Sequence, residues 1–275
     1  MRLSPLRMSL YIAGLFRVFT VAVAVLAGLL PAPAPAADAP LPAAEGPVPV
    51  AEVIDAETLR LADGRRLRLA GIAVPNGAAD SYAAAARQAL VLLVRDRPVL
   101  FAFGARHMDR HGRFGAQVWQ AAGDGGNGRG VWLQAALLAD GFARVATAPD
   151  NLLLVPEMLR VEDEARRARR GLWDDPAFRV RTPEDAGAAL DSFQLVEGRV
   201  LAVAVRRRGG YLNFGADYRT DFTLGLSREA LRLMRQADFD PMSLQGVRVR
   251  ARGWLRSFNG PLIEITHPEQ IEVLQ

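Results

Sequence analysis

The chain of 275 residues contains no cysteine, no lysine and only three histidines. The absence of cysteine excludes disulfide bonds and cysteine-bound zinc or iron-sulfur centres, so a metal would need oxygen or histidine ligands. All 34 basic residues are arginines. Arginine suits bidentate contacts to phosphate, although a GC-rich coding sequence produces the same bias.

Long apolar runs are scarce, and the longest lies near the N-terminus. The apolar residues 18–30 are preceded by Arg2, Arg7 and Arg17, and residues 34–36 read Ala-Pro-Ala. This pattern predicts a signal peptide over residues 1–37 and export to the periplasm or the cell exterior. The run is shorter than the roughly 20 residues of a bilayer span, so an uncleaved membrane anchor is the lesser alternative. We expect no stable membrane span after cleavage.

A strong excess of charge of one sign is also lacking. The formal charge is +4, and the leader supplies three arginines and no acid, which leaves +1 from residue 38 onward. Any affinity for nucleic acid must therefore come from local groups of arginines rather than from the charge of the whole chain.

Hydrophobic periodicity predicts two β-rich domains. A Pro/Ala-rich linker is expected at residues 38–49, a first domain at 50–178, a second linker at 179–190 and a second domain at 191–275. In the first domain, alternating apolar residues flank Asp63-Gly64, which indicates a hairpin. Helices are expected at residues 79–94, at 131–140 and from Pro156 onward, with strands at 98–103 and 114–121.

The second domain repeats the β-rich pattern. Strands are expected at residues 193–205, 211–214, 220–226, 247–254 and 262–265, with one short helix at 228–236. About five strands and one helix in some 85 residues fit a small OB-like barrel. The overall fold class is therefore mainly β with α.

Three short segments carry chemistry, namely "DAET" (55–58), "RLAGIAVPN" (68–76) and "DRHGR" (109–113). In this order, and followed by the helix "EDEARRARRGLW", they resemble the thermonuclease family of staphylococcal-nuclease-like proteins over residues 48–176. The resemblance implies an OB-type five-stranded barrel with three helices that binds calcium and cuts DNA or RNA. It also implies that Arg68 and Arg113 hold the phosphate and act in catalysis.

The same comparison shows where the sequence departs from the family. Glu57 stands where a calcium-binding aspartate is expected, which makes it the candidate calcium ligand. Ala73 and Asn76 stand where a second calcium ligand and the glutamate that activates water are expected. Calcium prefers six to eight oxygen ligands, and an amide cannot accept a proton from water, so we expect weak calcium binding and weak or absent hydrolysis.

The second domain offers a further set of arginines. Arg248, Arg250 and Arg252 alternate with apolar residues and predict one basic face on a strand, which is a candidate nucleic-acid contact. Five aromatic residues offer possible stacking platforms for single-stranded nucleic acid: Tyr211, Phe214, Tyr218, Trp254 and Phe258. The alternative is a solvated basic face above an aromatic core.

Three functions remain open from the sequence. The first is an exported nucleic-acid binder that contacts phosphodiesters through Arg68 and Arg113. The second is an active metal-dependent phosphodiesterase, an endonuclease acting on DNA or RNA. The third is an envelope scaffold that binds a protein partner and no nucleic acid.

Overall fold

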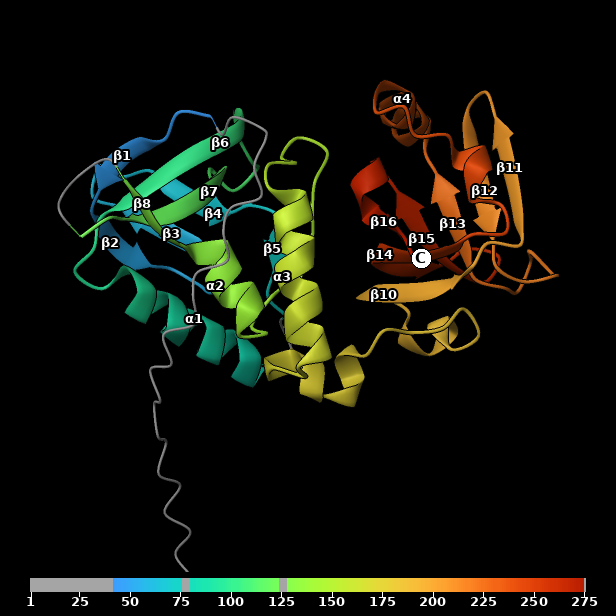
Figure 1. Cartoon of the computed structure of the whole chain (residues 1–275), viewed down its shortest axis with the longest axis horizontal. Helices are drawn as coiled ribbons and strands as arrows, with labels where there is room; N and C mark the ends of the chain where they lie inside the picture. The colour runs from blue at the N-terminus through green and yellow to red at the C-terminus, as the bar shows by residue number, and fades with distance from the viewer. Residues whose placement is uncertain (1–41, 76–79, 124–127, 275) are drawn as a thin grey trace, which may run out of the picture. The chain divides into compact units, whose positions relative to one another are not determined.

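The computed structural model describes residues 42–75, 80–123 and 128–274 (Figure 1). Contacts group residues Asp38–Gln275 into one compact unit, separate from Met1–Ala37. The predicted signal peptide lies outside the described residues, as does the first part of the predicted linker 38–49. The division of the compact unit into domains at 50–178 and 191–275 stays a prediction. No helix in the described ranges is both long and apolar enough to span a bilayer.

The first sheet contains seven strands in the order β1-β6-β7-β4-β3-β2, with β8 paired to β7. Only β4 and β7 run parallel, and the other pairs are antiparallel. The strands are β1 (Glu45–Val48), β2 (Val50–Val53), β3 (Thr58–Leu61), β4 (Arg66–Leu69), β6 (Val99–Met108), β7 (Phe114–Ala121) and β8 (Arg129–Trp132). The predicted hairpin at Asp63-Gly64 joins β3 to β4.

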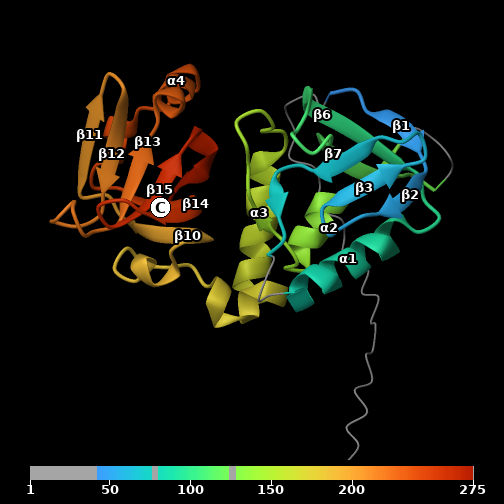
Figure 2. The same ribbon diagram turned by 180° about the vertical axis from the view of Figure 1, so that it is seen from behind.

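Three helices accompany this sheet: α1 (Asp80–Val94), α2 (Leu133–Ala139) and α3 (Val155–Arg167). The helices α1 and α2 contact each other, and they also contact β2 and β7 respectively (Figures 1 and 2). Between them they help cover a core that includes the fully buried Leu59, Leu67, Leu69, Phe101 and Val118. A short pair of strands, β5 (Ile72–Ala73) and β9 (Arg144–Val145), lies outside the main sheet.

The predicted helix at residues 131–140 begins two residues late. Val131 and Trp132 belong to β8 because Trp132 pairs with Trp119 of β7, and the two indoles stack with their centroids 6.4 Å apart. The β-branched and aromatic side chains fit a pleated surface better than a helix. The other two helices of this segment begin within one residue of the predicted positions.

The second sheet also contains seven strands, in the order β10-β14-β15-β13-β12-β11, with β16 paired to β14. Its elements are β10 (Ser192–Arg199), β11 (Ala202–Arg206), β12 (Gly209–Asn213), β13 (Thr223–Leu226), α4 (Arg228–Gln236), β14 (Arg248–Ser257), β15 (Pro261–Ile265) and β16 (Ile271–Val273). Short 3-10 helices complete the chain at Gly171–Asp174, Pro176–Phe178, Ala186–Ala189, Pro241–Leu244 and Pro268–Gln270. The Ser227 hydroxyl caps α4 by accepting a hydrogen bond from the Ala230 amide.

The two sheets have the same strand order. When β1, β2, β3, β4, β6 and β7 are matched with β10, β11, β12, β13, β14 and β15, every pairing corresponds, including the single parallel pair. In both halves a helix, α1 or α4, lies between the fourth and fifth of these matched strands. The chain therefore contains one topology twice.

The predicted five-stranded barrels differ from the observed sheets in strand number and closure. The ends of each pairing path, β1 with β2 and β10 with β11, are consecutive strands, and no pairing in the described residues joins them. Pro49 separates β1 from β2 because it has no amide hydrogen to donate. At the second break, the amides of Val200 and Leu201 donate to Val247 and Asn213, so the chain changes its partner strand there. The observed class is a mixed, β-rich fold with four α-helices.

Candidate functional site

Glu57 and Arg68 form an ion pair at the end of the β3–β4 hairpin strands. The Nε and Nη2 atoms of Arg68 donate to Oε2 of Glu57 at 3.1 and 2.9 Å. The Val74 amide donates to Oε1 of Glu57 at 2.5 Å. The Glu57 backbone carbonyl also accepts from the Leu69 amide. Both carboxylate oxygens of Glu57 are therefore engaged within the chain.

Arg113 has its own carboxylate partner, Asp109, at the start of β7. The Nε and Nη2 atoms of Arg113 lie 2.8 Å from Oδ2 of Asp109, and the Arg113 amide donates to Oδ1 at 3.0 Å. Burial of the Asp109 carboxyl raises its pKa, but the hydrogen bonds from Arg113 and His111 outweigh this effect and hold the pKa below its usual value. Asp109 therefore stays ionised and keeps the guanidinium in place.

Thr58 brings the two arginines to one neighbourhood. It is the register partner of Arg68 on the adjacent strand, and its hydroxyl lies 3.5 Å from Nη1 of Arg113. The parallel pairing of β4 with β7 also sets Arg68 opposite Gly115, two residues beyond Arg113. Arg68 in β4 and Arg113 just before β7 thus lie on neighbouring parallel strands. The Arg68 side chain is 36% exposed and that of Arg113 is 23% exposed, so solvent reaches both.

The described residues do not fit a calcium ion. Both oxygens of Glu57 already accept hydrogen bonds, and Ala73 has no side-chain oxygen. Within the ranges that the structure describes, no three His, Cys, Asp or Glu side chains come together in a group that suits a metal. Asn76 lies outside the described residues. Glu57 acts here as an anion that holds Arg68 and the Val74 amide.

The predicted basic face on β14 is distributed differently from the expectation. The alternation itself is present, since Val249 and Ala251 are buried in the core. However, Arg250 is 8% exposed and Arg252 is 1% exposed. Arg248 remains at the surface, where its Nη2 lies 2.7 Å from Oε1 of Glu197. The structure therefore does not bring the three guanidinium groups to one open surface.

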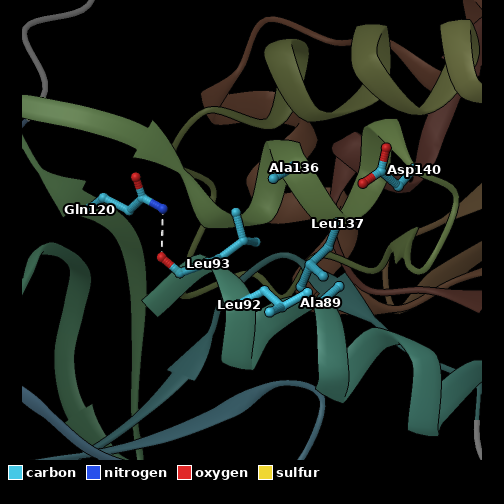
Figure 3. A pocket seen from close by; sticks show the side chains of 7 residues that line it. All are labelled: Ala89, Leu92, Leu93, Gln120, Ala136, Leu137 and Asp140. Atoms are coloured by element: carbon cyan, nitrogen blue, oxygen red, sulfur yellow. Dashed lines mark hydrogen bonds between the residues drawn. The ribbon is translucent and has the colours of Figure 1, made fainter. Parts of the chain in front are cut away.

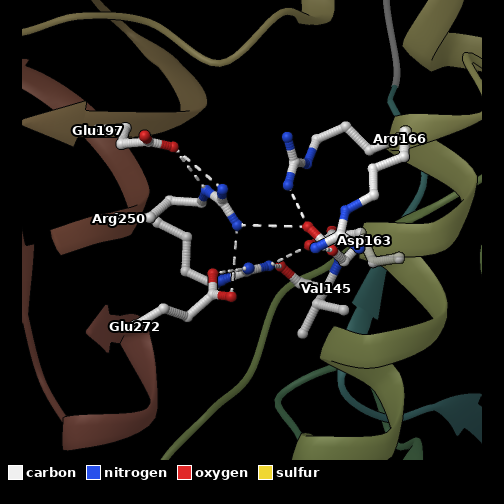
Figure 4. A network of polar contacts seen from close by, with 9 residues as sticks. Val145, Asp163, Arg166, Glu197, Arg250 and Glu272 are labelled. Atoms are coloured by element: carbon white, nitrogen blue, oxygen red, sulfur yellow. Dashed lines mark hydrogen bonds and ion pairs between the residues drawn. The ribbon is translucent and has the colours of Figure 1, made fainter. Parts of the chain in front are cut away.

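The two buried arginines are neutralised by carboxylates (Figure 4). Arg250 pairs with Glu197 at 3.0 Å and lies 3.7 and 3.6 Å from Asp163 and Glu272. Arg252 pairs with Glu272 and, at 2.8 Å, with Glu162 of α3.

Arg252 and Glu162 also share the backbone of one residue in β9. The Arg252 guanidinium donates to the Val145 carbonyl at 3.1 Å, and Glu162 accepts from the Val145 amide at 2.6 Å. The network thus connects β14 to α3 and β9. The prediction that Arg250 and Arg252 contact nucleic acid is therefore wrong. Guanidinium groups that are buried and paired cannot reach a phosphate in this arrangement.

The five aromatic residues of the second half divide into two groups. Phe214 is buried against Phe222, with ring centroids 5.0 Å apart, and belongs to the core. The other four are exposed by about half or more: Tyr211, Tyr218, Trp254 and Phe258. Phe214 is therefore a core residue, and a stacking role for the four exposed rings stays a prediction.

A separate apolar pocket of about 280 Å³ lies between α1, α2 and β7 (Figure 3). Its lining includes Leu92, Leu137 and Gln120, whose amide donates to the Leu93 carbonyl. Asp140 stands at its rim, and burial raises the pKa of this carboxyl although Arg170 opposes the shift. The pocket contains neither of the two site arginines.

Two comparisons relate the chain to known proteins. The staphylococcal nuclease homologue family matches residues 66–175, a range that contains Arg68, Arg113 and helices α1 to α3. Protein ParB of Escherichia coli is 37% identical over 130 residues, which are 45% of this chain and 70% of that protein. The chain belongs to the staphylococcal nuclease homologue family. Membership in this family points to a function related to nucleic acids.

Arg68 and Arg113 were predicted from the sequence, but the ion pairs that hold them were not. Asp109 lies four residues before Arg113, and this spacing was a signal for an ion pair across the tight turn. Thr58 could have been recognised as the residue opposite Arg68, because the Asp63-Gly64 hairpin fixes that register. No sequence signal pointed to Glu162 as a partner of Arg252, since 90 residues separate them.

Proposed function

We propose that this protein is an exported, nuclease-like nucleic-acid binder that grips a phosphodiester with Arg68 and Arg113. The observation that carries the proposal is the position of Thr58, which pairs in register with Arg68 and whose hydroxyl lies 3.5 Å from Nη1 of Arg113. Each is held by a carboxylate and remains partly open to solvent. Guanidinium groups bind phosphate oxygens in bidentate geometry and stabilise their charge.

Weak or absent hydrolysis is the second part of the proposal. Cleavage of a phosphodiester needs an acceptor for the proton of the attacking water, and a positioned base is worth about 10²- to 10⁴-fold in rate. The amide of Asn76 has no basic lone pair for this purpose. Glu57 is occupied by Arg68 and by the Val74 amide, which supports a structural role for it in place of calcium binding.

The proposal has a structural component as well. In each half, the two consecutive strands at the ends of the pairing path, β1 with β2 and β10 with β11, are proposed to act as one bent strand. This arrangement gives the order 1-2-3-5-4-1 of an OB-type barrel. The residues 1–37 are proposed to direct export, as their charge and apolar pattern indicate.

Oligonucleotide binding by variants tests the grip. We expect Arg68→Ala and Arg113→Ala each to weaken binding of a fluorescein-labelled oligonucleotide by roughly 10- to 100-fold, the loss of a charge-assisted hydrogen bond. Fluorescence anisotropy with DNA and RNA oligonucleotides measures this. Arg60→Ala is the matched control, because Arg60 is exposed on β3 and paired to Glu52. Equal effects of all three variants would contradict a specific site.

Glu57→Gln separates the proposal from the alternative of an active phosphodiesterase, which family membership favours. If Glu57 only restrains Arg68, the substitution leaves binding unchanged or tightens it, because the phosphate no longer competes with a carboxylate. If Glu57 holds a catalytic metal, cleavage seen with calcium or manganese is lost in Glu57→Gln and in EDTA. Rapid metal-dependent cleavage by the unaltered protein would overturn the binder proposal. An absence of both cleavage and salt-sensitive binding would favour a scaffold that binds a protein partner.

A further inference from the structure

The outward face of β14 changes character along its length. Five alternate positions point away from the core, and the first three, Arg248, Arg250 and Arg252, are all neutralised by carboxylates. The next two are Trp254, which is 60% exposed, and Arg256, which is also exposed. Phe258 follows just beyond the strand and is 60% exposed. We call Trp254, Arg256 and Phe258 the β14 stripe.

The Arg256 guanidinium has no ion pair among the described residues, in contrast to the three arginines before it. Alternate residues on a strand are about 6.6 Å apart, so the stripe places an aromatic ring and a cation in succession along one line. Aromatic faces stack on bases of any sequence, and arginine contacts the intervening phosphates. An exposed aromatic side chain alone needs no ligand, but an aromatic ring followed by an unpaired arginine offers both a stacking face and a phosphate contact.

A second aromatic-arginine pair lies beside the end of the stripe. The turn after β14 packs closely on the loop before β13, since a Cβ placed on Gly260 would lie 2.7 Å from the carbonyl oxygens of Thr220 and Asp221. This loop carries Tyr218, which is 56% exposed, and Arg219, whose guanidinium lies 5.6 Å from the Tyr218 ring centroid. Tyr218 and Arg219 therefore continue the stripe onto a neighbouring loop.

The acids of this loop do not neutralise its arginine. Asp221 accepts from the Asp217 amide at 2.7 Å, and Asp217 accepts from the Arg219 amide at 3.0 Å, so both carboxylates shape the backbone of the loop. Glu264 is exposed on β15, the strand next to β14. Its charge disfavours a phosphate chain that crosses β15, so a bound strand would follow β14 toward the Tyr218 loop.

We infer that the β14 stripe, with Tyr218 and Arg219, is a second binding surface that takes single-stranded DNA or RNA by base stacking. It is distinct from the Arg68 and Arg113 site. Stacking between neighbouring base pairs covers the faces of the bases in a duplex, so the surface selects unpaired strands. It also occupies the part of β14 that the buried ion pairs leave free.

Trp254 supplies the test, because its exposed position allows replacement without disturbing the core. Oligo(dT) titrations of the purified protein are followed by anisotropy and by tryptophan fluorescence. We expect Trp254→Leu and Phe258→Leu to weaken binding about 5- to 150-fold, whereas Trp254→Phe, which keeps a ring, retains most of the affinity. Met242→Ala, at another half-exposed apolar side chain, is the control for general surface effects.

Repeating the titration with Arg68→Ala/Arg113→Ala separates this inference from the proposed function. If the stripe binds on its own, the double variant still binds oligo(dT). That remaining affinity is lost when Trp254→Leu is added to the double variant. Unchanged affinity in Trp254→Leu and Phe258→Leu would overturn the inference even if the two arginines bind phosphate. Stronger binding to phosphatidylglycerol vesicles than to oligo(dT), equally retained by leucine and phenylalanine at position 254, would instead assign the stripe to a lipid surface and overturn it.

Discussion

Arg68 and Arg113 each form an ion pair with a carboxylate of the same chain, and a ligand must compete with these carboxylates. A phosphate must compete with Glu57 for Arg68 and with Asp109 for Arg113. In return, the paired side chains lose less rotamer freedom on binding, because each guanidinium is already held in one orientation. The ion pairs therefore weaken phosphate binding but hold the two guanidinium groups in a defined geometry.

His267 is the residue whose ionisation we expect to control stability in mildly acidic solution. It is 1% exposed, and both ring nitrogens are within hydrogen-bond distance of a threonine hydroxyl, Thr147 at 2.6 Å and Thr266 at 2.8 Å. The Thr266 hydroxyl donates to Gln270, so it accepts from Nδ1 of His267, and Nε2 accepts from Thr147. Burial lowers the pKa of His267 to about 4, although Asp150 opposes the shift.

Because this pKa is depressed in the folded state, the unfolded chain binds a proton between about pH 6.5 and pH 4 that the folded chain does not. The contribution to stability is complete above pH 6.5 and is lost as the pH falls. We expect a slope of up to about 1.4 kcal/mol per pH unit between pH 6 and pH 5 that is absent in His267→Gln. Urea unfolding at several pH values measures it, and parallel slopes for both proteins would refute it.

The residue-level prediction from sequence was partial for a physical reason. Arg68 and Arg113 were predicted as site residues from the resemblance of their short segments to the thermonuclease family, and this assignment stays a prediction. The burial of Arg250 and Arg252 could not be predicted, since it depends on Glu162 and Asp163, which lie far away in the chain. An alternating arginine pattern describes which way side chains point, and it does not describe what covers them.

At the scale of elements, local signals decided the accuracy of prediction. The bounds of α4 agree with the sequence prediction because Ser227 caps one end and the amphipathic pattern runs to Gln236. The single predicted strand at residues 193–205 is two strands, β10 and β11. Residues 200–205 are all apolar, so the sequence shows no interruption at the break, and the pattern alone cannot show that the hydrogen-bond partner changes there.

Gly141 follows α2 and packs against the backbone of Arg170 and Gly171, just after α3. We expect this position to tolerate no side chain. Its φ is +70°, and an added Cβ would lie 2.1 Å from the carbonyl oxygen of Arg170. Gly141→Ala combines left-handed strain with a backbone clash and should lower the free energy of unfolding by about 2 to 5 kcal/mol.

Gly64 is the matched control for this substitution. Its φ is +88°, but nothing lies within 4 Å of an added Cβ. Gly64→Ala should therefore cost only about 1 to 2 kcal/mol, from the left-handed conformation alone. Denaturant unfolding of the two variants gives the comparison. Similar losses in both proteins would show that the contact with Arg170 contributes nothing.

At the scale of the whole molecule, buried ion pairs connect segments on both sides of the predicted domain boundary. Glu162 of α3 is 3% exposed and binds Arg252 of β14 and the Val145 amide at once. Breaking a buried pair by removing one partner costs about 3 to 5 kcal/mol, because the other charge stays buried. Such a connection makes the two sheets unfold together even though they share no strand.

We therefore expect one calorimetric transition for the unaltered protein at pH 7 and two for Glu162→Gln. The substitution keeps the shape of the side chain and removes its charge, so Arg252 loses an ionic partner. Glu164→Gln is the control on the same helix, since Glu164 pairs with Arg160 and is 58% exposed. A single transition at an unchanged temperature in Glu162→Gln would show that the ion pair does not couple the sheets.

The repeated strand order has a consequence for synthesis of the chain. Every strand of the first sheet lies within residues 45–132 and every strand of the second within 192–273, with no exchange between them. The earlier half can thus complete its hydrogen-bond ladder while the later half is still on the ribosome, since domains generally fold in order of emergence. Once the first sheet has formed, its inner strands are paired on both sides, and this order of folding reduces mispairing between the two copies of the topology.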